Sequence, residues 1–166
     1  VQVRNRGTVG GGLAHADPAE DLPAAILALD VEVKAAGPAG HRWIPAREFF
    51  ITMLTTSLMP EELLIEIRIP VRKGYKFAYQ KASRQAAGFA IVGVAVSLKE
   101  SADGVCEDLA IGITGVGDVA YRADKIEAAL RGQKLDDRAI ASAATLVTDG
   151  VDAIEDVNAT PGYRSH

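Results

Sequence analysis

Two glycine-rich segments have residue types and a spacing that could bind a phosphate group. The first, GTVGGG, runs from Gly7 to Gly12, and the second, GVGDVA, runs from Gly115 to Ala120. Glycine lets backbone N–H groups approach a ligand without an intervening Cβ atom, and a threonine adds a hydroxyl group. The first segment has no Walker lysine, and His15 occupies the last position of its G-x-G-x-x-G pattern. Spacing alone therefore leaves a phosphate cradle and a plain tight loop as equal alternatives.

The second glycine segment matches the dinucleotide-binding pattern G-x-G-x-x-G/A between a predicted strand and a predicted helix. Asp136 or Asp137 would then be the ribose ligand, about 20 residues further on. A parallel strand should follow the helix in such a fold, but residues 133–150 predict another helix. Asp118 would also bring a negative charge to the turn that holds the pyrophosphate. We therefore favour a plain strand-to-helix connection, with an NAD-binding protein as the weaker alternative.

The composition excludes several classes of protein. The 166 residues are 48% hydrophobic and 24% charged, with a formal net charge of −4, which is typical of a soluble globular protein. The absence of a dense Lys/Arg cluster argues against a nucleic-acid binder or an anionic-membrane binder, and no run approaches the roughly 18 apolar residues of a membrane span. The single cysteine, Cys106, excludes an internal disulfide and predicts a reducing, cytoplasmic location. The three histidines, His15, His41 and His166, lie far apart, so we expect no metal site.

The chain divides near Pro70 into two predicted domains, 1–70 and 71–166. In the first, we expect the glycine loop, an irregular turn at Asp17 and a helix from Asp21 to Leu29. The remaining predicted elements are a strand at 31–33, a GPAG turn at 37–40, a strand at 41–44, a short helix at 46–54 and a strand at 63–69. The last strand alternates in polarity, so it should bury one apolar face made of Leu63, Ile65, Ile67 and Ile69.

The second domain has the pattern of a helix-covered antiparallel sheet. Tyr75, Phe77 and Tyr79 alternate with polar and small residues and predict a strand with an aromatic core face. Further strands are predicted at 90–98 and 105–114, joined by a hairpin turn at Asp103-Gly104, followed by helices from 123 to 131 and after Asp136, and by an extended surface tail. The expected class is therefore α+β, with a three-stranded antiparallel sheet and helices in this domain.

Four segments, taken in order, resemble one known family. They are RNRGTVGG (residues 4–11), the helix start Asp21-Leu22-Pro23, ELLIEIRIP (62–70) and FAYQKASRQAAGFAIV (77–92). Together they are similar to the FAD-binding medium subunit of molybdenum hydroxylases, the family of carbon monoxide dehydrogenase, xanthine dehydrogenase and aldehyde oxidase. The resemblance covers nearly the whole chain, and it implies a partial flavin module in residues 1–70 and the C-terminal domain of the flavoprotein subunit in residues 71–166.

The resemblance also implies where FAD would lie. Its diphosphate and ribityl region would be lined by Thr8, Gly10, Gly11 and Gly12, and Ala14 and His15 would follow along the cofactor. Asp21 would accept a hydrogen bond from FAD, Leu64 would pack against the isoalloxazine ring, and Gln80, Lys81 and Phe89 would lie near the ring edge. The residues themselves also allow plainer interpretations. Asp21 could be a helix cap, Leu64 a core leucine and His15 an ordinary loop histidine.

Three positions depart from the family pattern. Gly12 stands where the family carries Asn, Asp or Ser, which removes one polar contact to the cofactor. Gln85 replaces a common arginine and Gly88 a common acidic residue in the loop beside the flavin. The family's subunit also has an earlier subdomain of roughly a hundred residues or more with its own Gly-Gly loop, and nothing in this sequence corresponds to it.

The implied function is electron transfer without an acid–base or nucleophilic residue of the chain's own. By the resemblance, a small subunit with [2Fe–2S] clusters and a large subunit with the molybdenum cofactor would be the partners in a hetero-oligomer. Electrons would pass through FAD to an external acceptor, and the protein would position the cofactor. The alternative is a non-catalytic assembly module that docks to partner subunits and does not hold FAD by itself.

Overall fold

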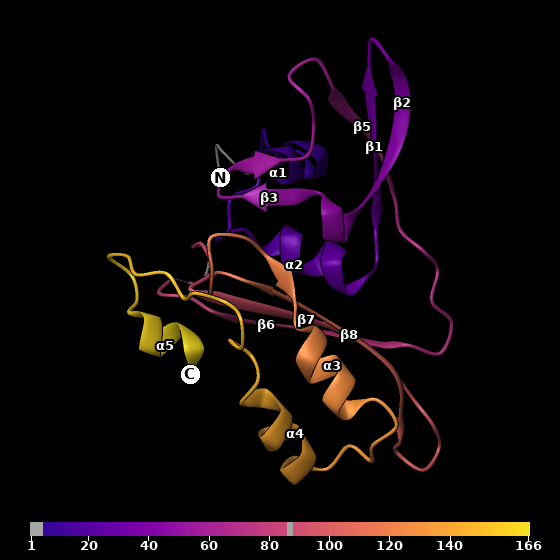
Figure 1. The fold of residues 1–166 in the computed structure, drawn as a ribbon, viewed down its shortest axis with the longest axis vertical. Coiled ribbons are helices and arrows are strands. Elements are labelled where there is room, and N and C mark those ends of the chain that lie inside the picture. The colour runs from indigo at the N-terminus through magenta and orange to yellow at the C-terminus, as the bar shows by residue number, and fades with distance from the viewer. Residues whose placement is uncertain (1–4, 86–87) are drawn as a thin grey trace.

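The computed structural model describes residues 5–85 and 88–166 and stacks two β-sheets with helices between and below them (Figure 1). The upper part contains helices α1 (Val9–His15) and α2 (Asp21–Ala28) and a three-stranded sheet in the order β2-β1-β5. Its strands are β1 (Glu32–Gly37), β2 (Gly40–Pro45) and β5 (Leu63–Arg68), all antiparallel. The 3-10 helix η1 (Ala46–Glu48) and the hairpin of β3 (Phe50–Thr52) and β4 (Thr55–Thr56) lie between β2 and β5 in sequence.

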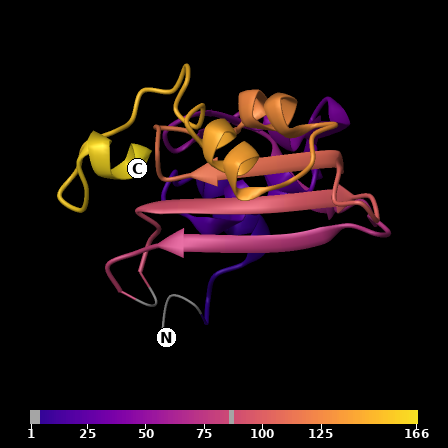
Figure 2. The ribbon, with the colours of Figure 1, turned by 90° about the horizontal axis from the view of Figure 1, so that it is seen from below.

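The lower part is the predicted helix-covered antiparallel sheet. Its strands run in the order β6 (Lys76–Ala82), β7 (Val92–Glu100), β8 (Cys106–Thr114) and β9 (Tyr121–Arg122). The two-residue strand β9 was not predicted. Helices α3 (Asp124–Leu130) and α4 (Asp137–Ala144) lie below the sheet and cover the part that contains β8. Strand β6 lies at the edge of the sheet that these helices do not cover (Figure 2). The predicted α+β class is confirmed.

Small residues let α2 fill the space between the two sheets. Ala24 and Ala28 of α2 form a buried cluster with Ala95 of β7. A Cβ atom on Gly112 of β8 would lie 2.0 Å from the Ala24 carbonyl oxygen, so only glycine permits this approach of helix to strand. The start of α2 is therefore held over the sheet of the second domain.

The upper core forms around a bulge in the pairing of β1 with β5. The register shifts between Lys34 and Ala35, which turns Leu64 and Ile67 toward the buried cluster that contains Leu13 and Phe49. The predicted alternation is wrong at the other apolar positions, because Leu63 is 71% and Ile65 50% exposed. A β-bulge adds one residue to a strand and reverses the faces on its two sides. That is the condition under which Leu64 can point inward.

Two further predictions of secondary structure are wrong. Residues 46–54 form η1 and then β3 rather than one helix, because Phe49 is fully buried and the following residues pair as a hairpin. The tail ends in a short helix, α5 (Pro161–Ser165), whereas the sequence predicted an extended surface segment. The Thr160 side chain accepts a hydrogen bond from the Tyr163 N–H, and Pro161 stands at the first helical position, where proline is favoured.

The predicted turn and cap of the second domain are confirmed. Gly104 has a φ of +76° in the turn between β7 and β8, a conformation that glycine adopts without strain. Asp136 caps α4, and its side chain accepts a hydrogen bond from the Ala139 N–H. Within residues 5–85 and 88–166, none of the helices has the length and apolar character needed to cross a bilayer.

Candidate functional site

The first glycine segment forms a helix instead of the predicted loop. Thr8 precedes α1, and its Oγ1 accepts a hydrogen bond from the Gly11 N–H at 3.0 Å. A side-chain cap of this kind satisfies one of the N–H groups that the first helical turn leaves without a backbone partner. Leu13 is fully buried and fixes the helix to the core. Thr8 and Gly11 remain exposed and Gly10 is half-buried, so backbone at the start of α1 reaches solvent.

Two of the glycines in α1 face residues from other segments. A Cβ atom on Gly10 would lie 3.5 Å from Leu64 Cδ2, and one on Gly12 would lie 2.3 Å from Glu20 Oε1. The structure thus brings Leu64 next to the glycine helix, as a half-buried residue of the upper core. It also places the Glu20 carboxylate where a side chain at position 12 would begin. Burial, and secondarily the charge of Asp17, raises the pKa of Glu20.

Asp21 and Lys81, which lie far apart in sequence, form one ion pair. The Asp21 carboxylate accepts hydrogen bonds from Lys81 Nζ at 2.8 Å and from the Tyr79 hydroxyl at 2.6 Å. Desolvation and the hydrogen bond to Asp21 raise the pKa of Tyr79, so its hydroxyl keeps its proton at neutral pH. The helix cap before α2 is Glu20, which makes no side-chain capping bond. The interpretation of Asp21 as a cap is therefore wrong.

A glycine in the neighbouring strand makes room for Tyr79. Gly93 pairs with Lys81 across β6 and β7, and a Cβ atom there would lie 2.3 Å from the Tyr79 hydroxyl oxygen. The next strand contributes Thr114, whose hydroxyl lies 2.6 Å from the Pro18 carbonyl oxygen. These contacts join the segment before α2 to the sheet beneath it. The start of α2, which carries Asp21, is therefore fixed from two sides.

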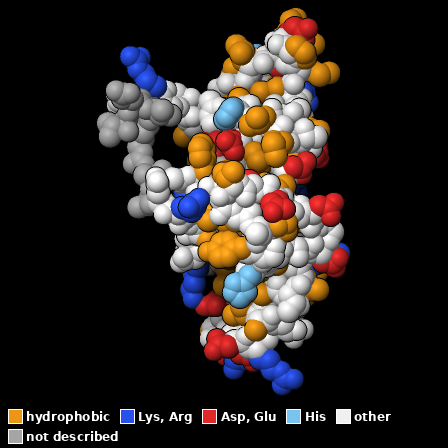
Figure 3. All heavy atoms as spheres, turned by 90° about the vertical axis from the view of Figure 1, so that its left-hand side faces the viewer, with side chains coloured by type: hydrophobic (Ala, Val, Ile, Leu, Met, Phe, Trp, Pro, Cys, Tyr) orange, Lys and Arg blue, Asp and Glu red, His pale blue; other side chains and the backbone are white. Residues whose placement is uncertain are grey.

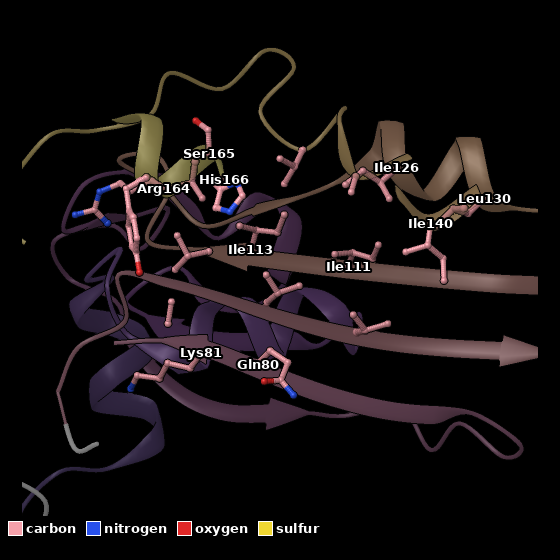
Figure 4. Close-up of a pocket in the computed structure, with 18 residues that line it drawn as sticks. Gln80, Lys81, Ile111, Ile113, Ile126, Leu130, Ile140, Arg164, Ser165 and His166 are labelled. Carbon is pink, nitrogen blue, oxygen red and sulfur yellow. The ribbon is translucent and has the colours of Figure 1, made fainter. Parts of the chain in front are cut away.

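Gln80 does not join this cluster. Successive residues of a strand face opposite sides of the sheet, and Gln80 faces the side on which the apolar residues of β7 and β8 meet α3 and α4 (Figure 4). There it lines a hollow of about 610 Å³ together with Ile111 and Ile113. Lys81 borders the same hollow, but its Nζ reaches the Asp21 carboxylate. Gln80 and Lys81, predicted together, therefore direct their polar groups to different places.

The remaining predicted residues are exposed. Ala14 and His15 lie at the end of α1, just before Ala16 ends the helix with a φ of 54°. Phe89 is 69% exposed and lines a cavity of about 650 Å³ with Arg84, Gln85 and Asp17. The side of the molecule at the left of Figure 1 carries many hydrophobic side chains (Figure 3). Arg4 of the first motif and Ala86 and Ala87 of the last lie outside the described residues.

The second glycine segment is a connection and not a dinucleotide site. Strands β8 and β9 on its two sides are antiparallel, whereas a dinucleotide-binding unit needs a parallel crossover. Gly115 has a φ of +82°, and a Cβ atom there would lie 2.3 Å from the Ile91 carbonyl oxygen. The glycine is explained by this backbone contact, which supports the plain connection that the sequence favoured.

Sequence reasoning missed Tyr79 and Glu20. Tyr79 was expected in the sheet core, but it lies on the same strand face as Lys81 and donates to the same carboxylate. Its spacing of two residues from Lys81 is the signal that could have found it. Glu20 has no comparable signal, because its contact with Gly12 depends on how α1 turns into α2.

The arrangement is suited to holding a cofactor rather than to acid–base chemistry. It offers bare helical backbone at Gly10 and Gly11, the Thr8 hydroxyl, an apolar contact at Leu64 and a charged cluster at Asp21. Across the described ranges, no three or more His, Cys, Asp and Glu side chains gather as a metal site would require. The Thr8 hydroxyl and exposed helical backbone are groups of the kind that can bind a phosphate, and Leu64 is an apolar group beside them.

Comparison with known protein families divides the chain in two. Residues 1–72 match the model of the FAD-binding domain in molybdopterin dehydrogenase. Residues 77–166 match the model of the CO dehydrogenase flavoprotein C-terminal domain.

Two known proteins are similar to nearly the whole chain. The chain is 36% identical over 165 residues to the 6-hydroxypseudooxynicotine dehydrogenase complex subunit alpha of Paenarthrobacter nicotinovorans, with 99% of this chain and 56% of that protein covered. It is 34% identical to the glyceraldehyde dehydrogenase medium chain of Sulfolobus acidocaldarius, covering 99% of this chain and 58% of that protein.

A solved carbon monoxide dehydrogenase from Hydrogenophaga pseudoflava superposes with a TM-score of 0.93 at 36% identity, over 99% of this chain and 57% of that chain. The chain thus spans little more than half the length of these relatives. It belongs to the family of FAD-binding medium subunits of carbon monoxide dehydrogenase and xanthine dehydrogenase-type oxidoreductases, as the sequence motifs predicted.

Proposed function

We propose that this chain is the part of a flavoprotein subunit that carries electrons from [2Fe–2S] clusters on a small subunit to an external acceptor. The large subunit of the same complex would hold the molybdenum cofactor, and the assembly would be a cytoplasmic hetero-oligomer. The observation that carries the proposal is the convergence of the predicted flavin residues. Gly10 faces Leu64, Gly12 faces Glu20, and the adjacent Asp21 bonds Lys81.

The residues of the chain would bind and orient the cofactor. The Gly10 backbone N–H and the Thr8 hydroxyl can donate hydrogen bonds to a diphosphate, while the Gly11 N–H already donates to Thr8 Oγ1. Ala14 and His15 continue along the same helix, and Leu64 offers an apolar contact for the ring. FAD supplies the two-electron redox chemistry when bound.

The Asp21 cluster would set the polarity beside the ring. Tyr79 and Lys81 both donate to the Asp21 carboxylate, which leaves that carboxylate further lone pairs to accept a hydrogen bond from the cofactor. Phe89, exposed at the mouth of the neighbouring cavity, would lie at the ring edge where electrons leave. Gln80 faces the side of the sheet opposite to the Asp21 cluster. We therefore place it only at the outer rim of the flavin site.

The second candidate is an assembly module that does not hold FAD by itself. The observation behind it is that the matched region covers 56% and 58% of two relatives, whose other residues could supply part of the cofactor contacts. The two candidates differ in whether the complete protein holds FAD, and contacts to a diphosphate from only one protein segment give weak affinity.

Flavin content separates these candidates. The protein expressed from its complete gene should retain about one FAD per chain after gel filtration, while the 166-residue chain alone should retain little. The ratio of flavin absorbance to protein absorbance measures both. A complete protein without flavin would contradict electron transfer through FAD. A 166-residue chain with nearly stoichiometric flavin would contradict the assembly module.

A further inference from the structure

A buried arginine in the last helix joins two of the segments that line the cavity at Phe89. Arg164 of α5 is 4% exposed. Its Nη1 donates to the carbonyl oxygens of Ile91 at 2.6 Å and Gly115 at 2.5 Å. Its Nη2 pairs with Asp156 Oδ1 at 2.6 Å. Figure 4 shows Arg164 at the edge of the apolar hollow that contains Ile111, where α5 borders it.

Two of the acceptors of Arg164, Ile91 and Asp156, line the same cavity. This cavity of about 650 Å³ is also lined by Arg84, Phe89 and Asn158. The Asp156 carboxylate also accepts hydrogen bonds from the Asn158 and Ala159 N–H groups, at 2.9 and 3.0 Å. These bonds and Arg164 hold the pKa of Asp156 below its usual range. The Arg164 guanidinium therefore joins the segment of Ile91 to the segment of Asp156.

The same contacts reach the segment before Asp21. The Ala90 N–H donates to the Ala19 carbonyl at 2.9 Å, and the Gly115 N–H donates to the Pro18 carbonyl at 2.7 Å. Arg164 thus binds the carbonyl of Gly115 and that of Ile91, and both Gly115 and the neighbour of Ile91, Ala90, bond the segment before Asp21. The loop that carries Phe89 is held between this segment and α5.

We propose that Arg164 is a positioning residue, which fixes the loop bearing Phe89 and so sets the access of the electron acceptor to the flavin edge. The inference rests on the proposed function, because Phe89 lies at the flavin edge only if FAD is bound as described. A buried guanidinium with carbonyl and carboxylate acceptors suits this task. Removing it leaves two carbonyls and a carboxylate without their charged donor.

A second buried arginine provides the matched control. The Arg122 side chain is 5% exposed, donates to the Leu27 carbonyl at 2.9 Å and pairs with Glu127 at 2.7 Å. It joins α2 to α3, and its partners Leu27, Asp30 and Glu127 do not line the cavity at Phe89. Arg122→Met and Arg164→Met both remove a buried guanidinium that binds a carbonyl and a carboxylate, so both should lower the melting temperature.

The first measurement is amide hydrogen exchange on the 166-residue chain. Arg164→Met should speed exchange at Ala90, Ile91 and Gly115 by about tenfold or more, because charged hydrogen bonds that hold their segments are lost. Arg122→Met should leave these three amides unchanged. Equal exchange at these amides in wild type and Arg164→Met would overturn the proposal, whether or not the chain binds FAD.

The second measurement follows the flavin in the assembled complex from the complete gene. Arg164→Met should slow flavin reoxidation by the acceptor and raise the acceptor KM by about tenfold. FAD content and flavin reduction by substrate should stay at wild-type level, and Arg164→Lys should recover part of the loss. Equal losses in Arg122→Met, or an equal loss in flavin reduction, would reduce Arg164 to a structural role. A wild-type complex without FAD would instead refute the proposed function.

Discussion

Replacing Gly112 with alanine is expected to destabilise the protein by about 3 kcal/mol and to lower its melting temperature by about 10 °C. The added Cβ atom would lie 2.0 Å from the Ala24 carbonyl oxygen and 3.1 Å from the Ala28 backbone nitrogen. Both neighbours are backbone atoms of α2, so the whole helix must move away from β8. Differential scanning calorimetry of the two chains measures the change.

The control is Gly162→Ala in α5, where a Cβ atom would meet nothing within 4 Å. This variant should melt within about 2 °C of wild type, because alanine is well tolerated in helices. If Gly112→Ala melts with the control, α2 does not pack on β8 at this point. The displacement of α2 would also move Asp21 of the candidate site, because this residue begins the helix.

Loss of the Asp21 carboxylate is expected to have the second largest effect. Asp21→Ala removes the acceptor of both Lys81 and Tyr79, and should lower the free energy of unfolding by about 2 kcal/mol. A double-mutant cycle with Lys81→Met should give a coupling of about 0.5 to 1 kcal/mol, because the Lys81 side chain is only 21% exposed while solvent partly screens Asp21, which is 46% exposed. Urea unfolding of the four chains gives these values.

An exposed ion pair of the same length is the control for this cycle. Arg47 Nη1 and Asp124 Oδ1 also lie 2.8 Å apart, but their side chains are 44% and 65% exposed. Solvent screens such pairs, so the coupling between Arg47→Met and Asp124→Ala should stay near or below about 0.5 kcal/mol. Equal coupling in both cycles would mean that the Asp21 cluster is only a surface contact.

Local patterns predicted most of the elements of the fold, and they did so where one signal dominated. The Asp103-Gly104 turn, the Asp136 cap and the helix from Asp21 were found because each depends on a few neighbouring residues. The glycine segment was expected to be a loop because glycine disfavours helices. It is a helix because the Thr8 cap and the buried Leu13 outweigh that cost.

The site was predicted only as a set of residues, since its geometry depends on long-range contacts. The alternation in β5 pointed Ile65 inward, and the bulge opposite Lys34 and Ala35 reversed it in favour of Leu64. Strand alternation also separates Gln80 from Lys81, although the two are adjacent in the motif. Arg164 stands in a tail without hydrophobic periodicity, so its burial could not be read from its neighbours.

The central claim is that FAD lies against the glycine face of α1, and the FAD affinity of Gly10→Ala tests it most directly. A Cβ atom on Gly10 would meet Leu64 Cδ2 at 3.5 Å, an ordinary contact, so the fold should be retained or slightly stabilised. The same methyl group would cover part of the Gly10 backbone to which the proposal assigns the cofactor diphosphate. Fluorescence titration of the protein from the complete gene should therefore show an affinity for FAD about tenfold weaker or worse. Gly162→Ala should bind FAD like wild type. Unchanged FAD affinity in Gly10→Ala, at unchanged stability, would contradict the placement of the cofactor on this helix.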